Sequence, residues 1–342
     1  MKKTLFLLFA ATTSLLCSSC FTSKKFLESY APEESSLNLV KITDESKNTV
    51  VAPAILTRPR DFANSKFGGN IKNGIYWSTL QCLSLSPDGN SLAYITQENR
   101  QNNIMVRKAG PQGVSTQRTF RNVMDMSWGS DGNIYFSDIN ASGYSSNTYI
   151  CSVKGESGSM MSQHTNGNVT DTNPVFANND KIFFTRIANG SPSIWSLDKK
   201  DGTLTSCARG YNPCPDPKNP GAFYCVRNNS NGRSEIWYIE YVIGKETLIV
   251  SDDNRSFTNP QLSPNGKWLL MVGNTKSSIS KKNNLDVFVV RTDGTQLTQL
   301  TYHPDNDVAP IWSNDGKSIF FISSRANKES YYNVWRMNFN IE

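Results

Sequence analysis

The chain has 342 residues, with 35 Lys and Arg against 29 Asp and Glu and a formal net charge of +6. Its 11% aromatic and 19% charged residues exclude an intrinsically disordered chain, and the length suffices for a large core. The basic residues are scattered rather than gathered into a stripe, so we expect no nucleic-acid partner. Only two histidines occur, His164 and His303, so we expect neither a metal site nor a cofactor.

The first 19 residues resemble a secretory signal peptide. Lys2 and Lys3 form a basic start, and residues 5–16 form an apolar stretch too short to span a bilayer. Residues 16–20 then resemble the lipobox of bacterial lipoproteins, in which cleavage exposes a cysteine that carries the lipid. This resemblance predicts lipidation at Cys20. The alternatives are cleavage as an ordinary signal peptide or a retained anchor.

A lipid on Cys20 would make residues 20–36 a lipidated tether, because its acyl chains suffice for stable attachment to a membrane. The folded part would then lie outside the cytoplasm, in the periplasm. Phe21 stands where an Asp often retains such lipoproteins in the inner membrane, so the outer membrane is favoured. Residues 37–78 follow as an N-terminal segment in which only 37–42 and 50–56 have the composition of strands.

An internal repeat organises residues 79–342. A short apolar stretch, an Asp-Gly or Asn-Gly turn and an apolar-aromatic strand recur together. Because Asp or Asn before Gly accepts positive φ, this pair predicts a tight hairpin. The copies are 83–94, 126–136, 174–184, a degenerate 212–225, 260–271 and 310–321.

A second short apolar segment, the second apolar phrase, follows each copy at a nearly constant distance. It begins at intervals of 42 to 51 residues, at Ile104, Tyr149, Ile194, Ile236, Val287 and Val334. A polar β run then precedes the next unit, most clearly at 296–301. Each repeat therefore holds four strands, and such units bury their faces by packing around an axis. The pattern predicts an all-β fold, a six-bladed β-propeller with four-stranded blades.

The last repeat ends soon after its third strand, so it lacks an outer strand. We expect the N-terminal segment, 37–78, to supply that strand, since an exchanged strand removes the open edge of the last blade.

At these repeats the chain resembles TolB-type propellers, whose repeat contains a Pro-x-Trp-Ser-Pro-Asp-Gly phrase and a Leu-Thr strand. The best matches are 310–316 and 297–301, and the likeness covers roughly 79–342. In that family a mixed α/β domain precedes the propeller. We expect no counterpart of it here, since only about fifty unpatterned residues fill its place.

The resemblance implies a partner-binding face on the loops that join one blade to the next. In TolB-type proteins that face docks a peptidoglycan-associated lipoprotein, so we expect an envelope protein of this kind as partner. The residues that match it are Arg121, Asp171, Thr172, Tyr211, Arg255, Phe257, His303, Asp305 and Asp307. Loops that only solvate the ring are the alternative for any one of them.

Three of the cysteines beyond the leader, Cys207, Cys214 and Cys225, lie within nineteen residues. In an oxidising compartment they could form one disulfide, either Cys207–Cys214 or Cys214–Cys225. Reduced thiols that pack as small core residues are the alternative.

Catalytic motifs are missing from the sequence. It has no Gly-x-Ser-x-Gly nucleophile elbow, and the aspartates of the repeated turns are explained by turn geometry. We therefore predict a non-catalytic envelope scaffold, with no catalytic residues, that binds a protein through one propeller face. The alternative is a hydrolase or lyase acting on envelope glycans or peptides from a site in the central channel. A sensor of small ligands or metal is the third possibility.

Overall fold

The computed structural model describes residues 38–43, 49–50, 81–98, 101–119, 123–142, 145–157, 160–276, 283–323, 325 and 332–339. The signal peptide, Cys20 and the tether lie outside these residues. All regular elements of the described part are strands, and none of its segments is a helix long and apolar enough to cross a membrane.

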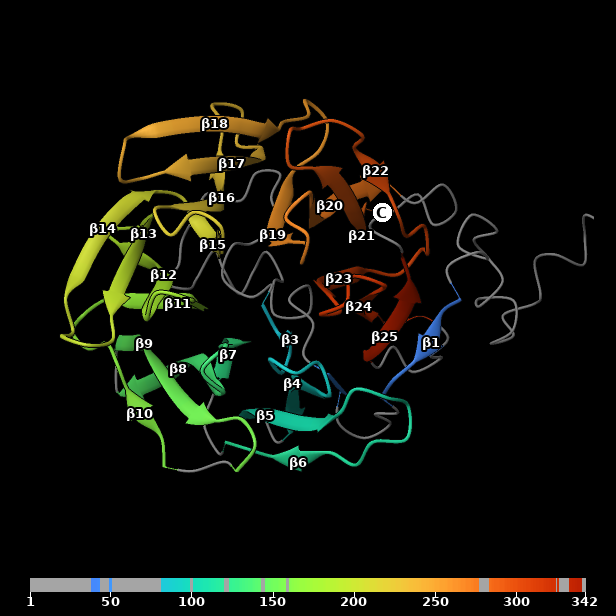
Figure 1. Cartoon of the computed structure of the whole chain (residues 1–342), viewed down its shortest axis with the longest axis horizontal. Coiled ribbons are helices and arrows are strands. Elements are labelled where there is room, and N and C mark those ends of the chain that lie inside the picture. Colours follow the sequence, from blue (N-terminus) through green and yellow to red (C-terminus); the bar gives the residue numbers. More distant parts are fainter. Residues whose placement is uncertain are drawn as a thin grey trace, which may run out of the picture.

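The strands form antiparallel groups of four that follow one another around a ring in chain order (Figure 1). This arrangement is the predicted all-β propeller. The described strands divide in chain order into six groups, two of which, within 123–163 and 170–209, join into one eight-stranded sheet through a parallel pairing of Thr148 with Thr170. The first three are β3 (Leu83–Leu85), β4 (Ser91–Glu98), β5 (Gln101–Lys108) and β6 (Thr116–Gln117); β7 (Val123–Trp128), β8 (Asn133–Ser142), β9 (Ser145–Lys154) and β10 (Ser162–Gln163); β11 (Thr170–Ala177), β12 (Lys181–Ala188), β13 (Ser191–Asp198) and β14 (Leu204–Arg209).

The remaining groups are β15 (Tyr211–Pro215), β16 (Ala222–Asn228), β17 (Ser234–Glu240) and β18 (Lys245–Val250); β19 (Phe257–Leu262), β20 (Trp268–Lys276), β21 (Asn283–Arg291) and β22 (Thr298–Gln299); β23 (Asp307–Trp312), β24 (Ser318–Ser323) and β25 (Asn333–Asn338) with β1 (Val40–Lys41). A further short strand, β2 (Thr49–Val50), pairs with β4.

The predicted Asp-Gly turn closes the first hairpin of the first blade. Gly89 has φ +75°, the left-handed conformation that the turn requires. The Ser86 hydroxyl donates to Asp88 and accepts from the Ser91 backbone N–H at 2.9 Å. Ser263 and Ser313 make the same pair of bonds in their own blades, so one serine fixes both arms of each turn.

The innermost strands share a bulge. Register shifts at the same place in β7, β11, β15, β19 and β23. In four of them a residue with positive φ stands directly before a proline: Asn173, Asn212, Asn259 and Ala309. Asparagine tolerates this left-handed conformation better than most residues, which explains its recurrence.

A threonine after the outer strand recurs with one role. Its hydroxyl accepts a hydrogen bond from a backbone N–H of the third strand, at the first or second residue of the second apolar phrase. The bonds are Ile104 N to Thr119 at 3.0 Å, Ile150 N to Thr165 at 2.9 Å and Val287 N to Thr301 at 2.9 Å.

The N-terminal segment completes the last blade, as predicted. Val40 pairs with Arg336 and Lys41 with Trp335, so β1 is the outer strand beside β25. Thr43 then accepts the Val334 backbone N–H at 3.0 Å. Residues 38–43 thus supply both the missing strand and the recurring threonine.

The first-hairpin turns and the connections from third to outer strand lie on one side of the ring, which we name the turn face. A backbone hydrogen bond ties each pair together in five blades. The bonds run from Ala109 to Asn90, Gly155 to Gly132, Lys199 to Asp180, Thr292 to Lys267 and Phe339 to Lys317, at 2.9 to 3.1 Å. The opposite side, which carries the connections between blades, is the connection face.

The clustered cysteines are free thiols, so neither predicted disulfide is formed. Cys214 and Cys225 lie on paired strands, β15 and β16, where Cys214 is opposite Tyr224. Their side chains therefore point to opposite faces of the blade and pack in different core clusters. Cys207 packs with Cys225, away from Cys214.

We expect Thr43→Val to lower the free energy of unfolding by about 1 to 3 kcal/mol, because it leaves the buried Val334 N–H without an acceptor. Thr116→Val on the exposed side of β6 is the matched control and should change stability by less than about 0.5 kcal/mol. Urea unfolding measures both. Equal effects of the two substitutions would contradict the role assigned to Thr43.

Candidate functional site

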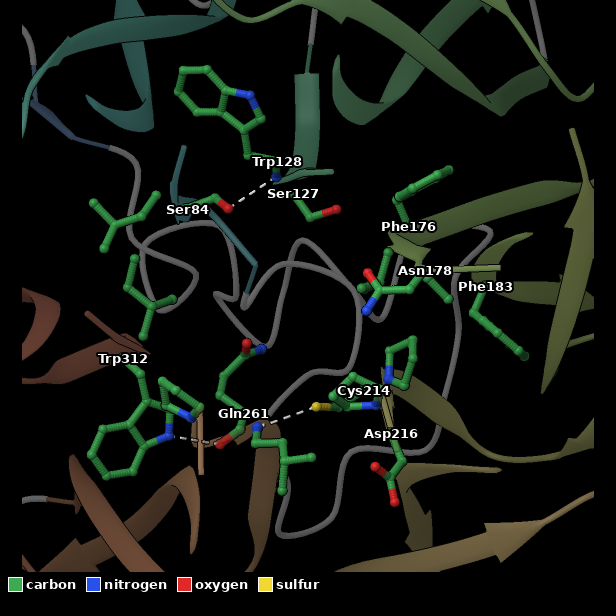
Figure 2. A pocket seen from close by; sticks show the side chains of 18 of the residues that line it. Ser84, Ser127, Trp128, Phe176, Asn178, Phe183, Cys214, Asp216, Gln261 and Trp312 are labelled. Atoms are coloured by element: carbon green, nitrogen blue, oxygen red, sulfur yellow. Dashed lines mark hydrogen bonds between the residues drawn. The ribbon is translucent and has the colours of Figure 1, made fainter. Parts of the chain in front are cut away.

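A cavity of about 430 Å³ lies at the axis of the ring and is lined by residues of all six blades (Figure 2). Its lining residues come from the ends of the inner strands and from the first-hairpin turns, so the cavity lies at the turn face. They include Ser84, Ser127, Asn178, Asp216, Gln261 and Trp312.

Neutral polar side chains of the wall point into the middle of the cavity. The side-chain amides of Asn178 and Gln261 point into it, whereas the rings of Trp128 and Phe176 point away from it (Figure 2). Amides both donate and accept hydrogen bonds, as a peptide backbone does. This arrangement suits a neutral, hydrogen-bonding ligand.

Hydrogen bonds between adjacent blades fix the cavity wall. Ser84 accepts the Trp128 backbone N–H at 2.9 Å, and Ser127 donates to the Pro174 carbonyl. On the other side of the ring, the Trp312 indole donates to the Gln261 carbonyl at 3.0 Å. Because its wall is held in this way, the cavity is largely formed before a ligand arrives.

The ionisable groups that line the cavity are poorly suited to catalysis. The Asp216 carboxylate points away from the middle and accepts the Tyr238 hydroxyl at 3.0 Å (Figure 2). Burial, and next the Asp216 carboxylate, raise the pKa of Tyr238 to about 12. Burial raises the pKa of the Cys214 thiol to about 12, which keeps it protonated and weakly nucleophilic.

A second polar layer surrounds the bulges of the inner strands. Asp125 is fully buried there and accepts hydrogen bonds from Ser137 and, at 3.4 Å, from the Asn173 amide. Burial raises the pKa of Asp125 to about 7, despite these hydrogen bonds, which act in the opposite direction. Asp125 is two residues from the cavity-lining Ser127 on β7 and is not itself part of the lining.

The pKa of Asp125 makes stability depend on pH. Because the folded-state value lies above the ordinary 3.8, its contribution is fully present below about pH 4 and is lost as the pH rises through about 7. The free energy of unfolding should therefore decrease as the pH rises, and we expect Asp125→Asn to reduce this decrease by on the order of 3 kcal/mol. Urea unfolding from pH 4 to 8 measures it, with Asp305→Asn as control. An unchanged pH profile in Asp125→Asn would contradict this assignment.

The residues predicted to form the partner-binding face are mostly inaccessible. Arg121 lies outside the described residues. Among the others, only Arg255 and Asp305 have substantially exposed side chains. Six are buried and unavailable for direct contact with a partner: Asp171, Thr172, Tyr211, Phe257, His303 and Asp307.

Two of these six residues, Asp171 and Asp307, are buried carboxylates that each pair with an arginine from later in the chain. Arg186 of β12 makes a two-pronged ion pair with Asp171, at 2.8 and 2.9 Å. Arg325, just beyond β24, pairs with Asp307, and both side chains are almost fully buried. These carboxylates therefore stabilise their own blades.

We expect Asp307→Ala to lower the free energy of unfolding by about 3 to 5 kcal/mol, because it leaves a buried guanidinium without its counterion. Asp305→Ala, two residues away and half-exposed, should cost less than about 0.5 kcal/mol. Thermal unfolding compares the two variants. Similar melting temperatures would show that the Asp307 pair contributes little.

Other candidate catalytic groups lie away from the cavity. Ser152 and His164 form a hydrogen bond of 2.8 Å, and burial lowers the pKa of His164. Neither residue lines the cavity, and Ser152 is buried. Across the described residues, no group of three His, Cys, Asp or Glu side chains could hold a metal ion.

The fold is that of a TolB-like propeller. A TolB from Agrobacterium tumefaciens superposes with a TM-score of 0.56 at 16% identity, covering 77% of this chain and 91% of that one. A TolB from Acinetobacter baumannii gives 0.54 at 14% identity, covering 75% of this chain and 63% of that one. An oligogalacturonate lyase from Vibrio parahaemolyticus also gives 0.54, at 10% identity, covering 89% and 94%.

No protein-family model matches the chain. A segment of 97 residues is 29% identical to an uncharacterized peptidase, YuxL, of Bacillus subtilis. The match covers 28% of this chain and 14% of that protein.

Proposed function

We propose that this protein is a non-catalytic scaffold of the bacterial envelope that binds a protein partner through the turn face. The observation that carries this proposal is the axial cavity, in which Asn178 and Gln261 present neutral amides from a fixed wall. A peptide segment of a partner offers the N–H and C=O groups that such amides bind. We therefore expect the interface on the turn face, because most of the residues predicted to form it on the connection face are buried.

The lipobox resemblance at Cys20 and the TolB-like fold support the cellular setting. Together they favour a periplasmic protein held by a lipid, with the outer membrane as its site. A peptidoglycan-associated lipoprotein, the kind of partner implied by the resemblance to TolB-type propellers, is our first candidate.

Crosslinking of the membrane-attached protein in its native envelope, followed by mass spectrometry, tests the proposal. We expect one stoichiometric envelope protein, and a reduction in its recovery of at least about tenfold in Asn178→Trp and Gln261→Lys, which change the middle of the cavity. Arg255→Glu and Asp305→Lys on the connection face are matched controls and should retain the partner. All four variants must first show wild-type thermal unfolding.

The outcomes separate the two faces. Loss of the partner in the connection-face variants alone would move the interface to that side of the ring. Recovery of no protein would contradict the scaffold.

The alternative function is a hydrolase or lyase acting on envelope glycans or peptides. Two observations favour it: the similarity of the fold to that of an oligogalacturonate lyase and the cavity at the axis. Cleavage of oligosaccharide or peptide substrates by the purified protein, lost in Gln261→Lys, would establish it in place of the scaffold.

A further inference from the structure

The exposed aliphatic side chains of the described residues are concentrated on one side of the ring. Five of them lie on the connections from third to outer strand, at the turn face: Val114, Met160, Val242, Ile243 and Leu297. Four of these are 70% exposed or more. The other large hydrophobics exposed among the described residues are Leu204 and Leu248, on the outer strands β14 and β18, and Tyr302, on the connection face; all three are 45% exposed or less.

These side chains occupy equivalent positions in different blades. Hydrogen bonds between the third-strand ends and the first-hairpin turns place the connections that carry Val114, Met160 and Leu297 at the same end of their blades. In β15–β18, the pairing of Glu240 with Ala222 places residues 241–244 at that end as well. Val114, Met160, the Val242–Ile243 pair and Leu297 come from four blades around the ring.

The chain enters the fold at the same face. Because β1 runs antiparallel to β25, its start lies near the end of β25, where Phe339 N bonds to the Lys317 carbonyl. Asn38, the first residue that the structure describes, therefore lies at the turn face. Between Cys20 and Asn38 there are 17 residues, and an extended chain of that length spans at most about 60 Å.

Charge on these connections is balanced. Across residues 108–116, 154–162, 198–204, 240–246 and 291–298 there are six basic and six acidic side chains. Such a surface has no net attraction for anionic lipids, so any binding to a membrane would come from burial of apolar side chains and would be insensitive to salt.

We propose that the turn face rests on a lipid bilayer, with Val114, Met160, Val242, Ile243 and Leu297 inserted at its interface. The tether and the loop tips then act as two signals, and the second fixes the orientation of the ring. The cavity would open toward the membrane, which suits a partner segment that is itself anchored there. The proposal takes only the anchor at Cys20 from the proposed function and is independent of the partner.

Hydrogen exchange on the full lipid-anchored protein tests this orientation. The protein is reconstituted on protein-free phosphatidylcholine vesicles, with and without phosphatidylglycerol. We expect backbone amides of 110–115, 241–245 and 293–298 to exchange about tenfold more slowly than in the vesicle-bound double variant Val242→Asp/Ile243→Asp. Amides of 251–255 and 302–306 on the connection face should exchange equally in both proteins, and added salt should change nothing.

Tyr302→Asp on the connection face is the matched control and should retain the protection. Equal exchange at the tips in wild type and double variant would show that the tether lets the ring tumble freely and would overturn the proposal. Protection that requires added phosphatidylglycerol or a protein partner would overturn it as well. The partner-recovery experiment on cavity variants is separate, so either proposal can fail while the other stands.

Discussion

Closure of the ring by residues 38–43 is the constraint on which the rest of the structure depends. Without β1, the edge of β25 would expose unpaired backbone groups, and such edges invite pairing with other chains. Ile42 also packs in the core cluster that includes Leu83 of the first blade and Val334 of the last. The same six residues therefore complete a blade and join the two ends of the repeat array.

The cavity follows from the same repetition. Five of the six inner strands bend at a bulge, and all six end at a hairpin turn, so every blade brings one strand end to the axis. Bonds between neighbouring blades, such as Trp312 to the Gln261 carbonyl, hold these ends in place. Because one backbone plan serves every blade, the chemistry of the cavity is set by the side chains that vary, and here those in its middle are neutral amides.

The sequence was informative about the repeat and poor at locating exposed residues. The constant spacing between the Asp-Gly turns and the second apolar phrase predicted the strands. The missing outer strand predicted closure by the N-terminal segment, with 37–42 and 50–56 as candidates, and the structure uses the first. Asp171 and Asp307 could not be recognised as buried, since each depends on an arginine that follows 15 or 18 residues later, and periodicity does not report such pairs. The cavity residues adjoin the turns that the repeat located, which is the signal that could have found Asn178 and Gln261.

The two faces of the ring differ because different forces shape them. On the connection face, chain segments cross from the outer edge to the axis, and their polar side chains are buried in pairs such as Asp171 with Arg186. Connections on the turn face stay within one blade and have no neighbour to cover them, so side chains such as Met160 and Ile243 remain in solvent. Exposed aliphatic groups are unfavourable in water, and their recurrence in several blades is explained when that face is covered by an apolar surface in the cell.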